Sequence, residues 1–320
     1  MTQHIELLLA AAFFSAAMVT CFVTPAVIAL ARRAGALDHP RGRRLHAQAT
    51  PLWGGLAMMI GWGVALAFAL RAGMRLGLVH DLSGLHVTGI VIGCVLIGLV
   101  GAADDRFDLR PLPKMVGQIA AAAVALAFGV RITGLFGHPL ALWTGGVLTV
   151  IWIVAVVNVI NFVDGLDGLA AGVSAIAALT FAGMAAWRGQ TGAAVFAICI
   201  GGACLGFLPY NFNPARVFMG DLGSHFLGYA IAAVAIVGTF KIAATAALLS
   251  ALLVLGLPIG DTLLVVLRRY RNGQPISHGD RQHLHYRLLD SGLSQRQAVL
   301  VLYAVSIVFS LLAVLLSRFA

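Results

Sequence analysis

Long apolar stretches alternate with short polar segments along almost the whole of this chain. Ten of the stretches are long enough, or nearly so, for a membrane-spanning helix, which needs roughly 17–25 residues. They are residues 8–31, 52–70, 86–103, 115–130, 142–160, 168–187, 191–208, 222–239, 242–260 and 297–317. Only 10% of the 320 residues are charged, whereas a soluble domain carries about 25%. The sequence therefore predicts an all-α, polytopic membrane helix bundle of about ten spans (nine to eleven), built as a single domain over residues 1–320.

Most of the charged side chains gather in five polar clusters. The clusters are Asp38–Pro51, Asp104–Lys114, Asn158–Asp167, Asn211–Ser224 and Arg268–Arg287. Successive clusters are separated by two apolar stretches, and two crossings return the chain to the face from which it started. All five clusters are therefore expected on one side of the membrane.

The basic residues indicate which side this is. Of the 21 Lys and Arg residues, 15 lie in or beside the clusters, and the positive-inside rule places that side in the cytoplasm. With ten spans both termini then lie outside, and the start of the chain, with Glu6 and no basic residues, is not predicted to be a signal peptide. Topology and contact with anionic lipids would account for the basic residues without any catalysis. They do not explain why ten of the 12 acidic residues share the same face.

The second cluster places Asp104, Asp105 and Asp108 directly after the third apolar stretch. If the helix continues past the membrane, 100° per residue puts the three carboxylates in one quadrant. Like charges that close together repel each other unless a cation lies among them, and Mg²⁺ prefers carboxylate and phosphate oxygens. Lys114 begins the next span near the same surface. The alternative interpretation is a solvated helix end without a function.

The third and fourth clusters add amides and further acids. Asn158, Asn161, Asp164 and Asp167 recur every three residues, and polar groups within an apolar span are costly unless they have partners. A Gly-rich loop with an Asx turn is the alternative for this segment. Asp221 opens the eighth stretch, where an acid either holds a metal or caps the helix; the free amides of a helix N-terminus also attract anions. His225, one turn further on, is predicted to be structural.

The fifth and first clusters are basic. The fifth combines carboxylate, guanidinium and imidazole groups, of which Arg and His bind phosphate well. Two histidines only two residues apart, with no cysteine beside them, do not indicate a zinc site. In the first cluster, basic side chains at a membrane surface would attract a lipid phosphate, with topology charges as the alternative.

Taken together, the clusters resemble the polyprenyl-phosphate N-acetylhexosamine-1-phosphate transferase family. The matching segments are DHPRGRRLHAQATPLWGG, DDRFDLRPLPK, NVINFVDGLDGL, FMGDLGSHFLG and HGDRQHLHYRL, in the order of the family. The ending D-R-x-H-x-H is similar to the UDP-GlcNAc-type bacterial branch, whereas the muramyl-pentapeptide phosphotransferase branch would show three histidines in a row. Tyr286 departs from the family, because many relatives carry a further histidine there.

The resemblance implies a cytoplasmic active site in the bacterial inner membrane, with Mg²⁺ or Mn²⁺ as the cofactor. It implies transfer of sugar-1-phosphate, most simply GlcNAc-1-phosphate, from a UDP-sugar to undecaprenyl phosphate with release of UMP, as a first membrane step of O-antigen or other cell-envelope glycan synthesis. No nucleic acid partner is expected, and a homodimer is compatible with the fold. The expected site residues fall into three groups. They are Asp221 and Asn161 for the metal; Asp104, Asp105, Asp164, Asp167, His283 and His285 for catalysis; and Arg44, His46, Lys114, Asn158, Asp280 and Arg281 for substrate binding.

Two other classes of protein, and one other enzyme, compete with this interpretation. A secondary transporter would hold its polar residues near the bilayer midplane on broken helices, whereas these acids lie at span ends. A non-catalytic lipid-binding scaffold would keep the basic clusters but would not need the carboxylates. Muramyl-pentapeptide phosphotransferase remains the alternative within the same family.

Overall fold

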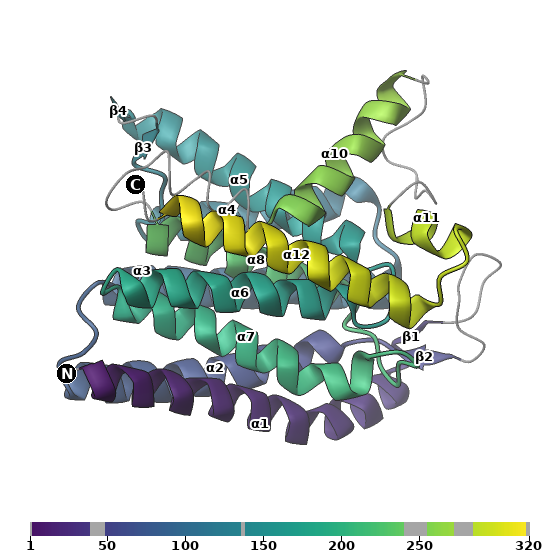
Figure 1. Ribbon diagram of the computed structural model, residues 1–320, viewed down its shortest axis with the longest axis horizontal. Helices are drawn as coiled ribbons and strands as arrows, with labels where there is room; N and C mark the ends of the chain where they lie inside the picture. Colours follow the sequence, from purple (N-terminus) through teal and green to yellow (C-terminus); the bar gives the residue numbers. More distant parts are fainter. Residues whose placement is uncertain (1, 39–48, 136–137, 240–254, 272–283, 318–320) are drawn as a thin grey trace.

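The computed structural model describes residues 2–38, 49–135, 138–239, 255–271 and 284–317 of the chain. Eleven helices and two short strand pairs make up these described parts (Figure 1). The helices are α1 Thr2–Ala34, α2 Gly54–Arg75, α3 Gly84–Phe107, α4 Pro111–Ala127, α5 Leu142–Val163, α6 Leu169–Trp187, α7 Thr191–Asn211, α8 Gly220–Thr239, α10 Gly256–Arg271, α11 Leu284–Asp290 and α12 Gln295–Ser317. The strands are β1 Leu37–Asp38, β2 Thr50–Pro51, β3 Gly134–Leu135 and β4 His138–Pro139.

Eight of the helices are long and apolar enough to cross a membrane, namely α1, α2, α3, α5, α6, α7, α8 and α12. Each coincides with a predicted span, so the all-helical, multi-pass class is confirmed. The predicted fourth span is the shorter apolar helix α4, with 17 residues. The predicted ninth span lies mostly in 240–254, outside the described residues, and α10 begins only at Gly256. The count of ten spans therefore stays a prediction.

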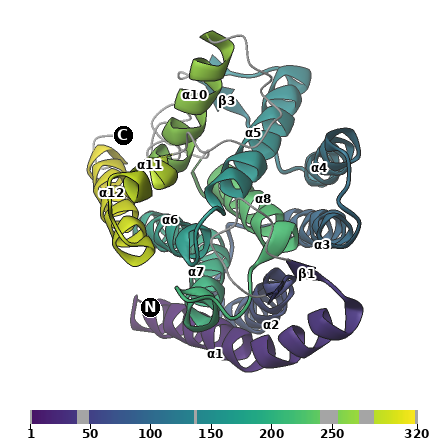
Figure 2. The ribbon, with the colours of Figure 1, turned by 90° about the vertical axis from the view of Figure 1, so that its right-hand side faces the viewer.

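α8 lies at the centre of the bundle. Seen from the end in Figure 2, it is surrounded by α2, α3, α5, α6 and α7, and it packs most extensively against α3 and α5. In the most apolar part of α8, 89% of the residues are buried inside the protein. The corresponding share is 28% for the peripheral helices α1 and α12. The helices packed around α8 therefore hold this helix firmly in place.

The helices run back and forth, so that their polar ends meet at one end of the bundle. The right-hand end in Figure 1 collects β1, β2 and α11, while the first turn of α1 and the last turn of α12 lie at the left. α3 stops at Phe107, where Asp108 takes a left-handed conformation with φ 51°. α4 begins at once with Pro111, whose fixed φ suits the first helical position. This tight turn keeps Asp104 and Lys114 at the same end.

The expectation that a continued helix would hold all three acids of the second cluster in one quadrant is wrong for Asp108. Because the helix ends at Phe107, the three acids of the second cluster do not share one helical quadrant. Asp104 and Asp105 occupy the last turn of α3, whereas Asp108 is exposed beyond it.

Extended backbone ties the first cluster to the fourth. β1 pairs antiparallel with β2, with Asp38 opposite Thr50. The amide of Phe218 donates to the carbonyl of Pro51 at 2.9 Å, and the amide of Gly54 donates back to the carbonyl of Phe218 at 2.9 Å. These bonds fix the loop that leads into α8.

Candidate active site

A large cleft opens at the polar end of the bundle. Its volume is about 1220 Å³, and it is lined by residues from β1, β2, α1, α3, α4, α7, α8, α11, α12 and the loops before α6 and α8. Acidic and basic side chains both line it. The acids and cations are Asp38, Asp104, Asp105, Asp108, Asp164, Asp167, Asp221, Arg32, Arg106, Lys114 and Arg216. Described residues from each of the five polar clusters therefore line the cleft, in keeping with the prediction that the clusters gather at one end of the bundle.

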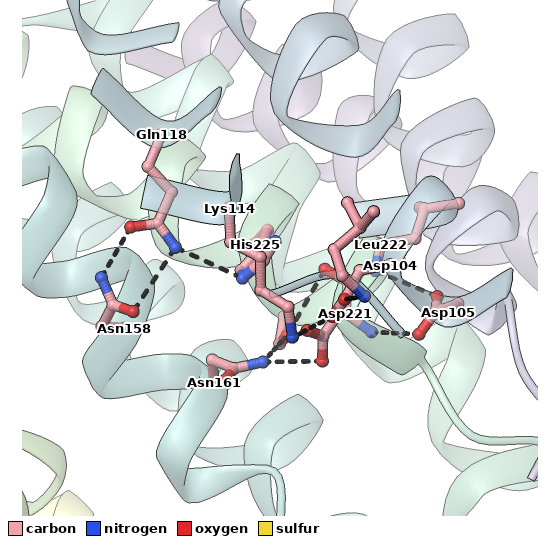
Figure 3. Close-up of polar contacts among 11 residues, drawn as sticks. Asp104, Asp105, Lys114, Gln118, Asn158, Asn161, Asp221, Leu222 and His225 are labelled. Carbon is pink, nitrogen blue, oxygen red and sulfur yellow. Dashed lines mark hydrogen bonds and ion pairs between the residues drawn. The ribbon is translucent and has the colours of Figure 1, made fainter. Parts of the chain in front are cut away.

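The N-terminus of α8 is capped by an acid from another helix. Asp105 Oδ1 accepts from the amide of Asp221 at 2.8 Å, and Oδ2 accepts from the amide of Leu222 at 3.2 Å (Figure 3). Gly220 makes this approach possible, since its φ is +69° and a Cβ there would collide with the Asp105 carboxylate. A helix N-terminus with free amides is stabilised by a carboxylate. Asp105 thus joins the end of α3 to the start of α8.

The carboxylate of Asp221 is consequently free for other contacts. Its Oδ1 accepts from Asn161 Nδ2 at 2.9 Å, and the same amide nitrogen also donates to Ser224 Oγ at 2.9 Å. Its Oδ2 lies 3.4 Å from the ammonium of Lys114. The alternative that Asp221 merely caps its own helix is not what the described contacts show, because Asp105 fills that role.

Lys114 bridges two acids. Its ammonium forms an ion pair with Asp104 Oδ2 and lies between that carboxylate and Asp221. Asp104 also accepts the amide of Leu109 through Oδ1 at 2.8 Å. Its side chain is 6% exposed, whereas those of Lys114 and Asp221 are each 27% exposed. All three side chains line the cleft, and Lys114 and Asp221 are the more exposed of them.

The oxygen donors at the start of α8 suit a hard cation such as Mg²⁺, which would also bind phosphate oxygens of a ligand. Within the described ranges, no three acid, histidine or cysteine side chains already form a closed metal site. Mg²⁺ does not require one, since it commonly keeps several waters and binds one or two carboxylates together with ligand phosphates. Asp221, with the Asn161 side chain beside it, fits such a partial set of oxygen donors.

Two further acids follow α5. Asp164 directly follows the last residue of α5, and Asp167 lies three residues later. Asp167 Oδ2 accepts from Asn213 Nδ2 at 2.9 Å and from the amide of Ala215 at 3.0 Å. It therefore holds the 213–215 loop at the cleft wall. Burial raises the pKa of Asp164 from 3.8 to about 8, with contributions from the charges of Asp221 and Asp167.

The raised pKa of Asp164 predicts a pH-dependent stability. Because the folded protein holds this proton more tightly than the unfolded chain, the group's stabilising contribution is full below about pH 4 and is lost as the pH rises through about 8. We expect the unfolding midpoint of the metal-free wild type in detergent to fall, relative to Asp164→Asn, between pH 5 and pH 8.5. A constant difference between the two proteins across that range would contradict the assignment.

The structure describes some of the predicted site residues, whereas others lie outside the described ranges. Asp104, Asp105, Lys114, Asn161 and Asp221 converge, and Asp164 and Asp167 line the same cleft. Asn158 lies one helical turn behind Asn161 and contacts Gln118 rather than the cleft. Arg44, His46, Asp280, Arg281 and His283 fall outside the described residues, as does the side chain of His285.

Several residues that contact or support the site were not predicted from the sequence. Ser224 shares the Asn161 amide with Asp221, and Gln118 is buried between three helices. Gln118 could have been found, because a lone amide in an apolar span needs a partner. Asp261 of α10 accepts from the amide of Leu284 at 2.7 Å and so anchors the start of α11. No local pattern in the sequence indicates that contact.

Comparison with known proteins agrees with this chemistry. The family model of Glycosyl transferase family 4 matches residues 87–239, which include all five converging side chains. A Bacillus subtilis (strain 168) protein named "Probable undecaprenyl-phosphate N-acetylglucosaminyl 1-phosphate transferase" is 36% identical over 95% of this chain and 84% of its own length. The chain belongs to glycosyl transferase family 4, among the polyprenyl-phosphate N-acetylglucosamine-1-phosphate transferases.

Other members of glycosyl transferase family 4 are similar over most of the chain. A "Decaprenyl-phosphate N-acetylglucosaminephosphotransferase" of Mycobacterium tuberculosis (strain ATCC 25618 / H37Rv) is 40% identical over 90% of this chain and 78% of its own. The "Undecaprenyl-phosphate alpha-N-acetylglucosaminyl 1-phosphate transferase" of Escherichia coli (strain K12) is 27% identical over 88% and 77%, respectively. The similarity thus extends well beyond the central segment that the family model matches.

Proposed function

We propose that this protein transfers GlcNAc-1-phosphate from UDP-GlcNAc to undecaprenyl phosphate and releases UMP. The observation that carries the proposal is the convergence of Lys114 and Asp221 at the wall of a cleft at one end of the helix bundle, with Asn161 hydrogen-bonded to Asp221. A phosphate on a membrane lipid lies at the membrane surface, level with helix ends. The names of the similar proteins supply the sugar and the polyprenyl phosphate.

The reaction is an in-line phosphoryl transfer. An oxygen of the lipid phosphate attacks the sugar-bearing phosphorus of the donor, a new P–O bond forms, and the bond to UMP breaks. The main barrier is electrostatic, because two anions must meet and charge shifts to the leaving UMP. The ammonium of Lys114 offsets part of this charge. Asp104, paired with Lys114, holds that ammonium in place and is the candidate to take a proton from the acceptor.

Mg²⁺ or Mn²⁺ is the proposed cofactor, held by Asp221 with Asn161 beside it. When bound, such a cation neutralises charge on the donor diphosphate. Asn161 orients the Asp221 carboxylate through its 2.9 Å bond. Asp105 sets the position of Asp221 by holding the first amides of α8. A direct transfer and a covalent phospho-enzyme both fit these roles.

The remaining predicted residues complete the site in this proposal. Asp164 and Asp167 border the nucleotide or the sugar. The segment that follows α10 supplies further groups for phosphate, and the first cluster supplies groups for the lipid phosphate. These are Asp280, Arg281, His283, His285, Arg44 and His46.

The proposal includes a topology. The chain acts as one membrane domain in the bacterial inner membrane, with the cleft facing the cytoplasm and both termini outside, as the distribution of basic residues favours. Self-association as a homodimer is compatible with this arrangement.

The test of the donor is a comparison of three substrates. Purified protein in detergent receives undecaprenyl phosphate, Mg²⁺ and UDP-GlcNAc, UDP-GalNAc or the UDP-linked muramyl-pentapeptide, and the lipid-linked product is separated by chromatography. We expect product with UDP-GlcNAc and at least about tenfold less with the other donors, since a missing or misplaced polar contact in a binding site costs this much or more. Product only with the muramyl-pentapeptide donor would overturn the proposal.

A further inference from the structure

Three polar side chains, Gln118 and His225 buried and Asn158 half-buried, form a hydrogen-bonded triad directly behind the converging site residues. Gln118 Oε1 accepts from Asn158 Nδ2 at 2.7 Å, and Gln118 Nε2 lies 3.4 Å from Asn158 Oδ1. The same Nε2 lies 3.5 Å from Nε2 of His225. Figure 3 shows Gln118 between its two partners, with Lys114, Asn161 and Asp221 beside them. Gln118 is 2% exposed and His225 is 1% exposed, so the triad does not face the cleft.

Each triad member lies one helical turn from a site residue on the same helix. On α4, Gln118 follows Lys114 by four residues; on α5, Asn158 precedes Asn161 by three; on α8, His225 follows Asp221 by four. Residues three or four apart share a helix face. The triad therefore joins the same three helices that carry Lys114, Asn161 and Asp221, about 5.4 Å deeper in the bundle.

The triad constrains how these helices can move relative to one another. A buried amide without a partner is unfavourable, so rotation or sliding of α4, α5 or α8 that separates the three side chains is opposed. Asn158 is also held to its own helix, because its Nδ2 donates to the carbonyl of Val154 at 2.8 Å. Apolar contacts between these helices tolerate small shifts, whereas hydrogen bonds fix direction as well as distance.

We propose that Gln118, Asn158 and His225 are positioning residues, which set the register of α4, α5 and α8 so that Lys114, Asn161 and Asp221 converge. None of the three touches the substrate in this scheme. The inference rests on the proposed function, because turnover and donor binding are its readouts. Outer partners of this kind commonly change activity or metal affinity by about 10- to 100-fold.

The test compares a single and a double variant. Gln118→Met leaves the Asn158 amide without its partner on α4, whereas Gln118→Met/Asn158→Leu removes both polar side chains. We expect the single variant to lower the unfolding midpoint in detergent and the double variant to recover much of it, because replacing both partners removes the orphaned group. kcat is expected to fall about 10- to 100-fold in both variants. Recovery of kcat together with stability would overturn the proposal, since the triad would then be merely structural.

Two further measurements separate positioning from folding. The rise in unfolding midpoint on adding UDP-GlcNAc with Mg²⁺ reports binding, and we expect it to shrink in both variants. Asn158→Ser is an additional variant if the double variant does not fold, because serine keeps a helix-backbone bond but cannot contact Gln118. Its kcat is expected to be at least about tenfold lower, and a wild-type kcat would overturn the proposal.

Tyr229→Phe is the matched control. The Tyr229 hydroxyl donates to the carbonyl of Ala121 at 3.3 Å, so it also joins α8 to α4, one turn further from the cleft. We expect this variant to lose stability but to keep kcat within about threefold, since the change is remote from the site residues. An equal loss of kcat in Tyr229→Phe would overturn a specific role for the triad. A wild-type protein without turnover would instead contradict the proposed function itself.

Discussion

Replacing Asp221 by asparagine is expected to lower turnover by about 10²- to 10³-fold or more, even at saturating Mg²⁺. The carboxylate faces the cleft, accepts from Asn161 at 2.9 Å and lies 3.4 Å from the Lys114 ammonium. Asparagine has nearly the same shape but no negative charge, so a cation and the ammonium would both lose their partner. The measurement is steady-state UMP release as a function of Mg²⁺ concentration.

Asp290→Asn is the control for this variant. Asp290 is exposed at the end of α11 and does not line the cleft. The same change of charge there is expected to leave turnover within about twofold, because exposed charges contribute little. Near-normal turnover of Asp221→Asn would show that the metal assignment is wrong.

Replacing Lys114 by methionine is expected to lower kcat by about 10²-fold. The ammonium lies between the carboxylates of Asp104 and Asp221, and without it these two negative charges face each other uncompensated. The cleft would also lose a cation where the donor and acceptor anions meet. Methionine keeps the length of the side chain, so the packing of α4 is largely preserved.

Arg110→Met is the matched control for Lys114→Met. Arg110 precedes α4, is exposed, and does not line the cleft, and the variant removes the same positive charge four residues away. We expect its kcat to stay within about threefold of the wild type, because exposed charges are screened. Equal losses in both variants would indicate that only the overall charge of this face matters, and not the position of Lys114.

The sequence predicts the class of the fold well, because membrane spans follow from local composition. Eight predicted spans coincide with long apolar helices, and the polar clusters do meet at one end. The expectation that Asp108 shares a helical quadrant with Asp104 and Asp105 was wrong, since a left-handed residue and a proline at the first position of α4 reverse the chain there. Helix ends depend on a few residues and are harder to predict than helix interiors.

Side-chain partners across helices were beyond sequence reasoning. Asp105 and Asp221 were both expected in the site, but nothing in their spacing shows that the first would hold the amides of the second. The link between Gln118 and His225 joins residues 107 positions apart. Such contacts depend on how helices rotate against each other, which periodicity alone does not specify. The spacing of three and four residues along each helix did indicate which side chains share a face.

The arrangement of charge has a physical logic. Four acids near one another would repel, and the fold relieves this in different ways for each. Asp105 is satisfied by helix amides, Asp104 by Lys114, and Asp167 by Asn213 and Ala215. Asp221 keeps a partly exposed carboxylate beside an amide and an ammonium. Among these four acids, it is therefore the one whose negative charge is most available to a cation in the cleft.

The most direct test of the central claim is UMP release by the wild-type protein in detergent. The complete assay contains UDP-GlcNAc, undecaprenyl phosphate and Mg²⁺; parallel assays omit the lipid or add EDTA. We predict UMP release that requires both the lipid and the divalent cation. UMP release that persists without undecaprenyl phosphate, or in the presence of EDTA, would contradict cation-dependent transfer to the lipid in this cleft.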